Sequence, residues 1–203
     1  MPRSVPDKPQ KVVRNTVTTR TQIGIEYDRI VEDGGAAILY YTVYIDDGNY
    51  GAFTAHSNGL LLKWIFSDAS LKSGLIYRVK YSSTNIHGES EPSNESLIML
   101  AEVPSAPANL HRTEWDSLPA GSIMLKWSLP EDEGGDPVTG YKLYVDSVLI
   151  EDASGSSTMN EYIFTNLSVG APYQLQVAAV NSIGESPAAS LTLLAASVPQ
   201  KLA

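Results

Sequence analysis

An internal repeat constrains the fold of this chain more than any other feature of its sequence. Three short motifs each occur twice, in the same order along the chain. They are Tyr-x-x-Tyr at 41–44 and 141–144, Leu-x-x-Gly-x-x-Tyr at 71–77 and 167–173, and Gly-Glu-Ser at 88–90 and 184–186. The first motif repeats after 100 residues and the other two after 96. Two copies of one fold explain both offsets if a few residues are inserted between the anchors, because loops vary most between copies.

Proline-marked segments open the copies and suggest where the domains begin. Val5–Pro9 opens the first copy, Val103–Pro107 opens the second, and another Val-Pro pair stands at 198–199. The third pair has the spacing of a further opening, so we expect a piece of a longer array. The predicted organisation is a first module at 5–101, a second module at 102–197, and the start of a following module or a linker at 198–203.

Apolar side chains alternate with polar or smaller ones in both copies, which is the pattern of a β-strand with one buried face. Such stretches begin at Ile23, Tyr41, Tyr77 and Leu97 in the first copy and at Ile123, Tyr141, Tyr173 and Leu191 in the second. Glycine-containing turns separate them. About seven short strands in about 95 residues are typical of an antiparallel sandwich. The sequence therefore predicts an all-β fold of two tandem antiparallel β-sandwiches with about seven strands each.

Four features of the second copy occur together in one known family. Trp127 and Tyr141 stand where that family keeps core aromatic residues, and Leu167–Tyr173 is similar to its tyrosine corner. Asn181–Ser186 is similar to the end of its F–G loop. Together these residues resemble the fibronectin type III domain, and the resemblance covers nearly the whole chain. It implies an immunoglobulin-like sandwich in which the corner tyrosine hydroxyl bonds back to the backbone.

The first copy departs from the family pattern in two places. Tyr27 stands where the second copy has Trp127, and the segment from His56 to Leu71 is longer and carries Leu60-Leu61-Leu62 and Trp64. We expect these apolar residues to fill the first sandwich where the tryptophan is missing. The alternative is an exposed apolar patch on which a partner docks.

Charge and composition exclude several classes of function. Fourteen basic residues stand against 23 acidic ones, for a net charge of −9, which disfavours binding to nucleic acid and to anionic membranes. There is no cysteine, so disulfides and thiolate metal sites are excluded. The first residues lack the apolar core of a signal peptide. The longest apolar runs are too short to cross a bilayer, so we expect no direct membrane insertion.

No residues in the sequence form a recognisable catalytic, cofactor-binding or metal site. His56, His87 and His111 lie far apart, and no nucleophile elbow or phosphate-binding glycine loop is present. The acidic pairs and triplets, Asp46-Asp47 and Glu131-Asp132-Glu133, are expected to be solvated turn residues. We therefore predict that the chain is not an enzyme, that it needs no cofactor, and that no catalytic, cofactor-binding or metal residues are to be named.

The resemblance implies non-catalytic protein-binding or spacer modules of a multidomain adhesion, receptor or matrix-type protein. A short, Pro-tipped link at 100–104 fits a spacer better than a Gly/Ser tether does. Two alternatives stay open: an intracellular structural array of a cytoskeletal or muscle-type giant protein, and spacer modules attached to a secreted enzyme. No Arg-Gly-Asp motif stands in either F–G loop. We therefore expect a protein partner whose identity the sequence does not give, and we expect the fragment itself to be a monomer.

The cellular compartment follows from which of these functions applies. The first predicts an extracellular or cell-surface location, and the structural array predicts a cytoplasmic or cytoskeletal one. Two Asn-x-Ser triplets, at Asn94 and Asn166, could carry a glycan in a secretory compartment, and Asn94 is the better acceptor because Asn166 lies beside the tyrosine corner.

Overall fold

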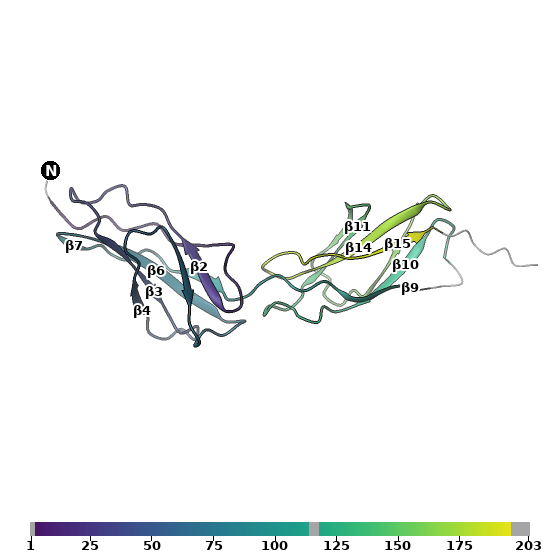
Figure 1. Ribbon diagram of the computed structural model, residues 1–203, viewed down its shortest axis with the longest axis horizontal. Helices are drawn as coiled ribbons and strands as arrows, with labels where there is room; N and C mark the ends of the chain where they lie inside the picture. Colours follow the sequence, from purple (N-terminus) through teal and green to yellow (C-terminus); the bar gives the residue numbers. More distant parts are fainter. Residues whose placement is uncertain (1–2, 114–117, 196–203) are drawn as a thin grey trace, which may run out of the picture. The chain divides into compact units, whose positions relative to one another are not determined.

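The computed structural model describes residues 3–113 and 118–195, and every regular element in these ranges is a β-strand (Figure 1). The chain divides into two compact units, one that ends at Ala101 and one that begins at Glu102. The predicted third opening, at 198–203, lies outside the described residues.

The first unit is built from two antiparallel sheets that enclose one core. One sheet has the order β1 (Val13–Arg14), β2 (Gln22–Glu26), β5 (Lys63–Ser67). The other has the order β4 (Thr54–Ser57), β3 (Tyr40–Ile45), β6 (Ile76–Asn85), β7 (Gly88–Glu89), with β8 (Ser96–Met99) also paired to β6. Strands β4 and β5 are therefore outer strands of different sheets, each paired on one side within the described residues.

The second unit repeats this plan. One sheet has the order β13 (Glu161–Phe164), β10 (Ile123–Ser128), β9 (Ala108–Thr113). The other has the order β12 (Val148–Ala153), β11 (Gly140–Val145), β14 (Pro172–Val180), β15 (Ala189–Leu194). All these pairings are antiparallel. The predicted all-β fold of antiparallel sandwiches is confirmed.

The two cores are filled by different aromatic residues at equivalent positions. In the second unit Trp127 packs edge-on against Tyr141, with ring centroids 5.4 Å apart. In the first unit Tyr27 packs against Tyr41 in the same way and also stacks on Tyr81, with centroids 4.1 Å apart. Tyr81 pairs with the middle of β3 at the register position that Val177 holds against β11. The larger tyrosine at this position therefore supplies the volume that the missing tryptophan leaves.

The apolar residues at 60–64, before and at the start of β5, are partly buried in two cases and exposed in two. Leu62 and Trp64 are partly buried and pack against the core of the first unit. Leu60 and Leu61 are exposed in the turn that connects β4 to β5. The Tyr27 hydroxyl donates to the Leu61 carbonyl oxygen at 2.9 Å, so this turn is tied to the core by the residue that replaces tryptophan.

A tyrosine corner closes each unit, as the sequence predicted. The Tyr173 hydroxyl accepts a hydrogen bond from the Ser168 backbone N–H at 2.9 Å. In the first unit the Tyr77 hydroxyl accepts one from Lys72 at 2.8 Å. Both bonds span five residues and hold the crossing between the two sheets.

A buried asparagine in each unit ties down the segment that opens it. Asn181 donates through Nδ2 to the carbonyl oxygens of Glu102 and Glu133, at 2.8 and 3.1 Å. Gly134 has a φ of 80°, and a Cβ there would lie 2.1 Å from the Glu102 carbonyl oxygen, so only glycine fits. In the first unit Asn85 Nδ2 donates in the same way to the carbonyl oxygens of Ser4 and Asp33, at 2.8 and 2.7 Å. The asparagine of the F–G loop is thus a structural residue.

Candidate functional site

The three histidines occupy separate places in the two units. His56 lies on β4, His87 lies in the turn between β6 and β7, and His111 lies on β9 with Nδ1 2.7 Å from the Asn109 carbonyl oxygen. Over residues 3–113 and 118–195, no three side chains of the metal-ligating types gather closely enough to hold a metal ion. The same part of the chain holds no helix with the length and apolar character needed to cross a membrane.

The loop between β3 and β4 is where the two units differ most. Eight residues (46–53) separate the paired residues Ile45 and Thr54 in the first unit. Only two, Asp146 and Ser147, separate the paired strands of the second unit, and both have a positive φ, as in a tight hairpin turn. The longer loop lies between the first two anchors of the repeat and adds six residues (8 − 2). The offset changes by only four (100 − 96), because the stretch from 54 to 71 is two residues shorter than the stretch from 148 to 167.

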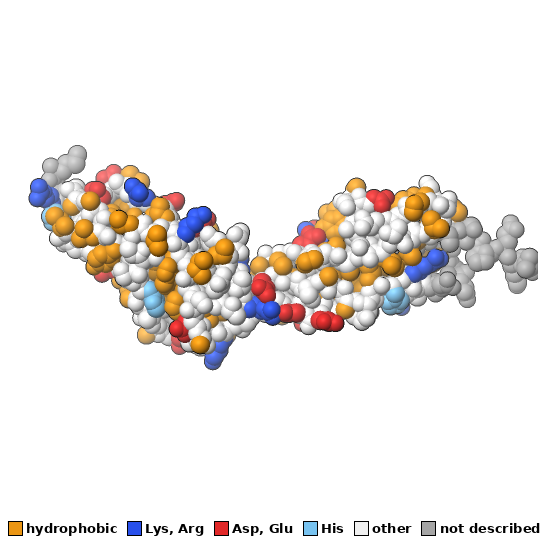
Figure 2. Space-filling view, in the orientation of Figure 1, with side chains coloured by type: hydrophobic (Ala, Val, Ile, Leu, Met, Phe, Trp, Pro, Cys, Tyr) orange, Lys and Arg blue, Asp and Glu red, His pale blue; other side chains and the backbone are white. Residues whose placement is uncertain are grey.

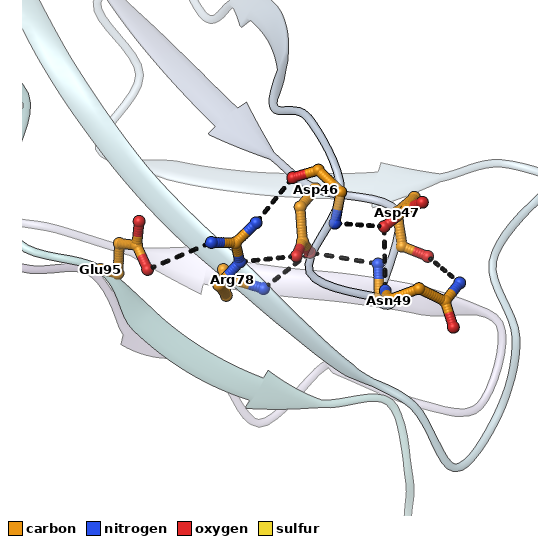
Figure 3. A network of polar contacts seen from close by, with 7 residues as sticks. Asp46, Asp47, Asn49, Arg78 and Glu95 are labelled. Carbon is orange, nitrogen blue, oxygen red and sulfur yellow. Dashed lines mark hydrogen bonds and ion pairs between the residues drawn. The ribbon is translucent and has the colours of Figure 1, made fainter.

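A buried ion pair holds this longer loop against β6 (Figure 3). Asp46 accepts hydrogen bonds from the backbone N–H and from Nε of Arg78, both at 2.8 Å. The Arg78 Nη2 donates to the Gly51 carbonyl oxygen at 2.6 Å, and its Nη1 lies 3.8 Å from a Glu95 carboxylate oxygen. The Asp46 side chain has no exposed surface, so the expectation that it is a solvated turn residue is wrong. Its charge is compensated by Arg78, which makes its burial tolerable.

The rest of the loop is fixed by its own polar and aromatic contacts. Asp47 Oδ1 accepts the backbone N–H groups of Asn49 and Gly51, at 2.9 and 3.0 Å, and these bonds lower the pKa of Asp47. The Arg78 guanidinium lies 4.7 Å from the ring centroid of Phe53. Tyr50, 70% exposed, has a φ of 61° and a ring centroid 5.2 Å from the same guanidinium. The loop is therefore a fixed feature of the surface, with Asp47 and Tyr50 presented to solvent.

A cleft of about 250 Å³ lies beside this loop, where residues of the outer strands β4 and β5 line it. Residues of this loop and of the turn after β5 both line it. The ring of His56 packs against Phe66 and Trp64, at centroid distances of 4.8 and 5.4 Å. The lining residues are Ile45, Asp46, Asp47, Thr54, His56, Phe66, Asp68, Ser70, Leu71 and Tyr77.

The charged groups around the cleft are mostly acidic. Hydrogen bonds from the side chain and backbone of Ser70 lower the pKa of Asp68, as backbone bonds do for Asp47, which also lines the cleft. Both are therefore carboxylates at neutral pH. No lysine or arginine lines the cleft, and within the described ranges neither carboxylate lies in an ion pair with one. The arrangement offers a negative rim over apolar and aromatic walls.

Sequence reasoning did not find this site. Asp68, Phe66 and Arg78 carry no motif, and the last of these lies 32 residues from the aspartate that it binds. The available signal was the change of offset between the two copies, which places an insertion between Tyr44 and Tyr77. The expectation that the segment from His56 to Leu71 is the longer one is wrong, because the extra residues lie at 46–53. The change of offset predicts a longer loop but not what the loop faces.

The second unit carries a different exposed feature. Val148, Leu149 and Ile150 are all exposed on β12, the outer strand of its sheet. Glu151 stands opposite Leu143 in the register position that His56 holds opposite Val43. Hydrophobic side chains elsewhere are dispersed over the visible face of each unit (Figure 2).

Comparison with models of known protein families gives a match within the second unit. Residues 105–193 match the family model described as "Fibronectin type III domain". The second unit is a fibronectin type III domain. The first unit has the same strand order, tyrosine corner and opening asparagine, so the resemblance to tandem fibronectin type III modules is confirmed.

Similar proteins extend the match across both modules. "Fibronectin type-III domain-containing protein 3A" of Pongo abelii is 27% identical over 196 residues, which cover 90% of this chain and 16% of that protein. "M-protein, striated muscle" of Gallus gallus is 27% identical over 157 residues, or 74% of this chain and 11% of that protein. The chain thus spans about a sixth or less of these curated relatives.

Solved structures show the same fold. The crystal structure of chicken CNTN1 FN1-FN3 domains superposes with a TM-score of 0.58 at 16% sequence identity, covering 96% of this chain and 69% of that one. This likeness supports the arrangement of strands in both fibronectin type III modules and carries no statement about partners.

Proposed function

We propose that the two modules are non-catalytic protein-binding units of a larger multidomain protein. The observation that carries this proposal is the difference between the modules. The first has an eight-residue loop locked by a buried ion pair beside an acidic and aromatic cleft, and the second has a two-residue turn at the same place. A module that only sets distance has no need of such a device, because function in this kind of fold resides in loops held by a rigid scaffold.

Replacing one module by the other within the whole protein tests the proposal. A second copy of residues 102–197 takes the place of residues 5–101, which keeps the fold and nearly the length. If the first module binds a partner, the proteins that crosslink to the native protein in its own cells change or disappear. If the same proteins crosslink in the same amounts, the first module acts only as a spacer, as it would beside the catalytic domain of a secreted enzyme, and the proposal fails because the difference between the modules carries it.

Two settings fit a protein-binding role. The first is a multidomain adhesion, receptor or matrix-type protein at the cell surface or outside the cell, with loops at the ends of the modules as contacts. The second is a structural array inside the cell. The similarity to M-protein of striated muscle over 74% of the chain supports the second setting.

Glycosylation separates the two settings. Asn94 and Asn166 are both exposed, and Asn94 Oδ1 accepts a hydrogen bond from Lys8 at 2.8 Å. Mass spectrometry of the native protein with full coverage of both peptides would show glycan at Asn94 if the modules pass through a secretory compartment. Unmodified asparagine at both positions would argue for the structural array.

A further inference from the structure

We propose that the cleft between the β3–β4 loop and the turn after β5 binds one arginine side chain from a protein partner. This inference rests on the proposed protein-binding function and specifies the chemistry of the contact. It concerns the first module alone, because the second has neither the long loop nor the histidine that line the cleft.

The size of the cleft fits a single side chain. Pockets for drug-sized ligands usually enclose about 300–1,000 Å³, and this one encloses about 250 Å³. Its walls near β3 and β6 are apolar and include Ile45, Leu71 and Tyr77. An extended aliphatic stem can cover these walls while its charged end stays near solvent.

The rim of the cleft is complementary to a cation. Asp47 and Asp68 both line the cleft, and both are ionised at neutral pH. The charge of Arg78 helps to lower the pKa of Asp47, and His56 helps to lower that of Asp68, but within the described ranges neither carboxylate forms an ion pair with a lysine or arginine. Asp46 is excluded as a ligand because it is committed to Arg78. The net charge of −9 adds long-range attraction for a basic partner.

The aromatic wall favours arginine over lysine. Phe66 and His56 pack against each other at 4.8 Å and both line the cleft. A guanidinium is planar, stacks on aromatic rings and is more weakly hydrated than an ammonium, so it binds between carboxylates and rings at a smaller desolvation cost.

The probes for a test are N-acetyl-arginine amide and its neutral counterpart, N-acetyl-citrulline amide. Each is titrated into the isotope-labelled 203-residue chain, and backbone amide shifts are followed by NMR. Arginine amide should shift amides of the cleft walls in the first module and leave the second module unchanged. We expect citrulline amide to bind at least about tenfold more weakly, because it lacks the charge that both carboxylates recognise.

Three variants locate the site. Asp68→Asn and Asp47→Asn should each weaken binding about two- to fivefold, the range for a solvent-exposed ion pair. Both keep the Oδ1 acceptor of their turn, so the fold is preserved. Asp33→Asn is the matched control, because Asp33 Oδ1 also accepts a backbone N–H two residues on, at 2.9 Å, but lies at the other end of β3. It should leave binding unchanged.

Equal binding of arginine and citrulline amides would overturn the inference, as would shifts spread over acidic surfaces of both modules. Identical affinities for Asp68→Asn, Asp33→Asn and the unchanged chain would do the same. These outcomes are separate from the module replacement above. If the replacement abolishes crosslinking while arginine amide fails to bind, the protein-binding function stands and the arginine site is wrong. If the amide binds and the replacement has no effect, the cleft has the stated chemistry and the proposed function fails.

Discussion

The buried asparagine of the F–G turn gives the sharpest stability prediction. Asn181 is 3% exposed, and its side chain both donates and accepts hydrogen bonds. Its Nδ2 donates to the carbonyl oxygens of Glu102 and Glu133, and its Oδ1 accepts the backbone N–H groups of Ile183 and Gly184 at 3.0 and 3.1 Å. A longer bond, of 3.4 Å, also runs from Nδ2 to the Asp136 carbonyl oxygen. Asn181→Ala removes all five bonds at once and leaves their backbone partners without this side chain.

The magnitude follows from the number of bonds lost. A typical intramolecular hydrogen bond contributes about 0.5–1.5 kcal/mol to stability, and a buried backbone group left unpaired costs more. Water can reach some of the five partners, since most of the Asn181 bonds lie at a partly buried loop. We therefore expect Asn181→Ala to lower the free energy of unfolding of the second module by about 2–4 kcal/mol.

The assay must resolve the two modules within the whole chain. Hydrogen–deuterium exchange across a urea series, with peptides separated by mass spectrometry, reports the unfolding of each module separately. Asn160→Ala is the matched control in the same module, since Asn160 is exposed and should change stability by less than about 0.5 kcal/mol. If Asn181→Ala and Asn160→Ala unfold at the same urea concentration, the reasoning about the buried asparagine is refuted.

Three further predictions use other residues. Tyr77→Phe should destabilise the first module by about 1–2 kcal/mol, and Tyr173→Phe should destabilise the second by about 0.5–1 kcal/mol. Both variants lose a corner hydrogen bond, and the loss costs more at Tyr77 because Tyr77 is the more buried. Urea midpoints that equal those of the unchanged chain would contradict this prediction. Gly134→Ala should cost at least about 1–2 kcal/mol from its positive φ alone, and circular dichroism melts that overlay those of the unchanged chain would refute the close approach to Glu102. Burial, aided by the carboxylate of Glu185, raises the pKa of Tyr144 to about 12. The unfolded chain releases this proton near pH 10, so stability from Tyr144 is present below pH 10 and lost as the pH rises toward about 12. Glu185→Gln should lower the pKa in an ultraviolet titration, and an unchanged curve would exclude the contact.

The sequence alone determined the architecture of this protein. Period-two alternation, turn residues and the repeated Leu-x-x-Gly-x-x-Tyr motif are local, so they can be recognised without knowing which strands pair. The corner hydrogen bonds of Tyr77 and Tyr173 span only five residues, and the motif predicts them. The same locality made Tyr27 visible as a departure from the core tryptophan.

Only the tertiary structure decided what surrounds each departure. The volume missing at Tyr27 is filled by Tyr81, a residue 54 positions away that the packing of one sheet on the other brings against it. Asp46 looked like a solvated turn residue and is buried, because Arg78 on another strand compensates its charge. In the same way Asp47 and Asp68 face one cleft only because β4 and β5 are outer strands of opposing sheets. Strand pairing joins residues distant in the chain, and no local pattern records which of them will meet.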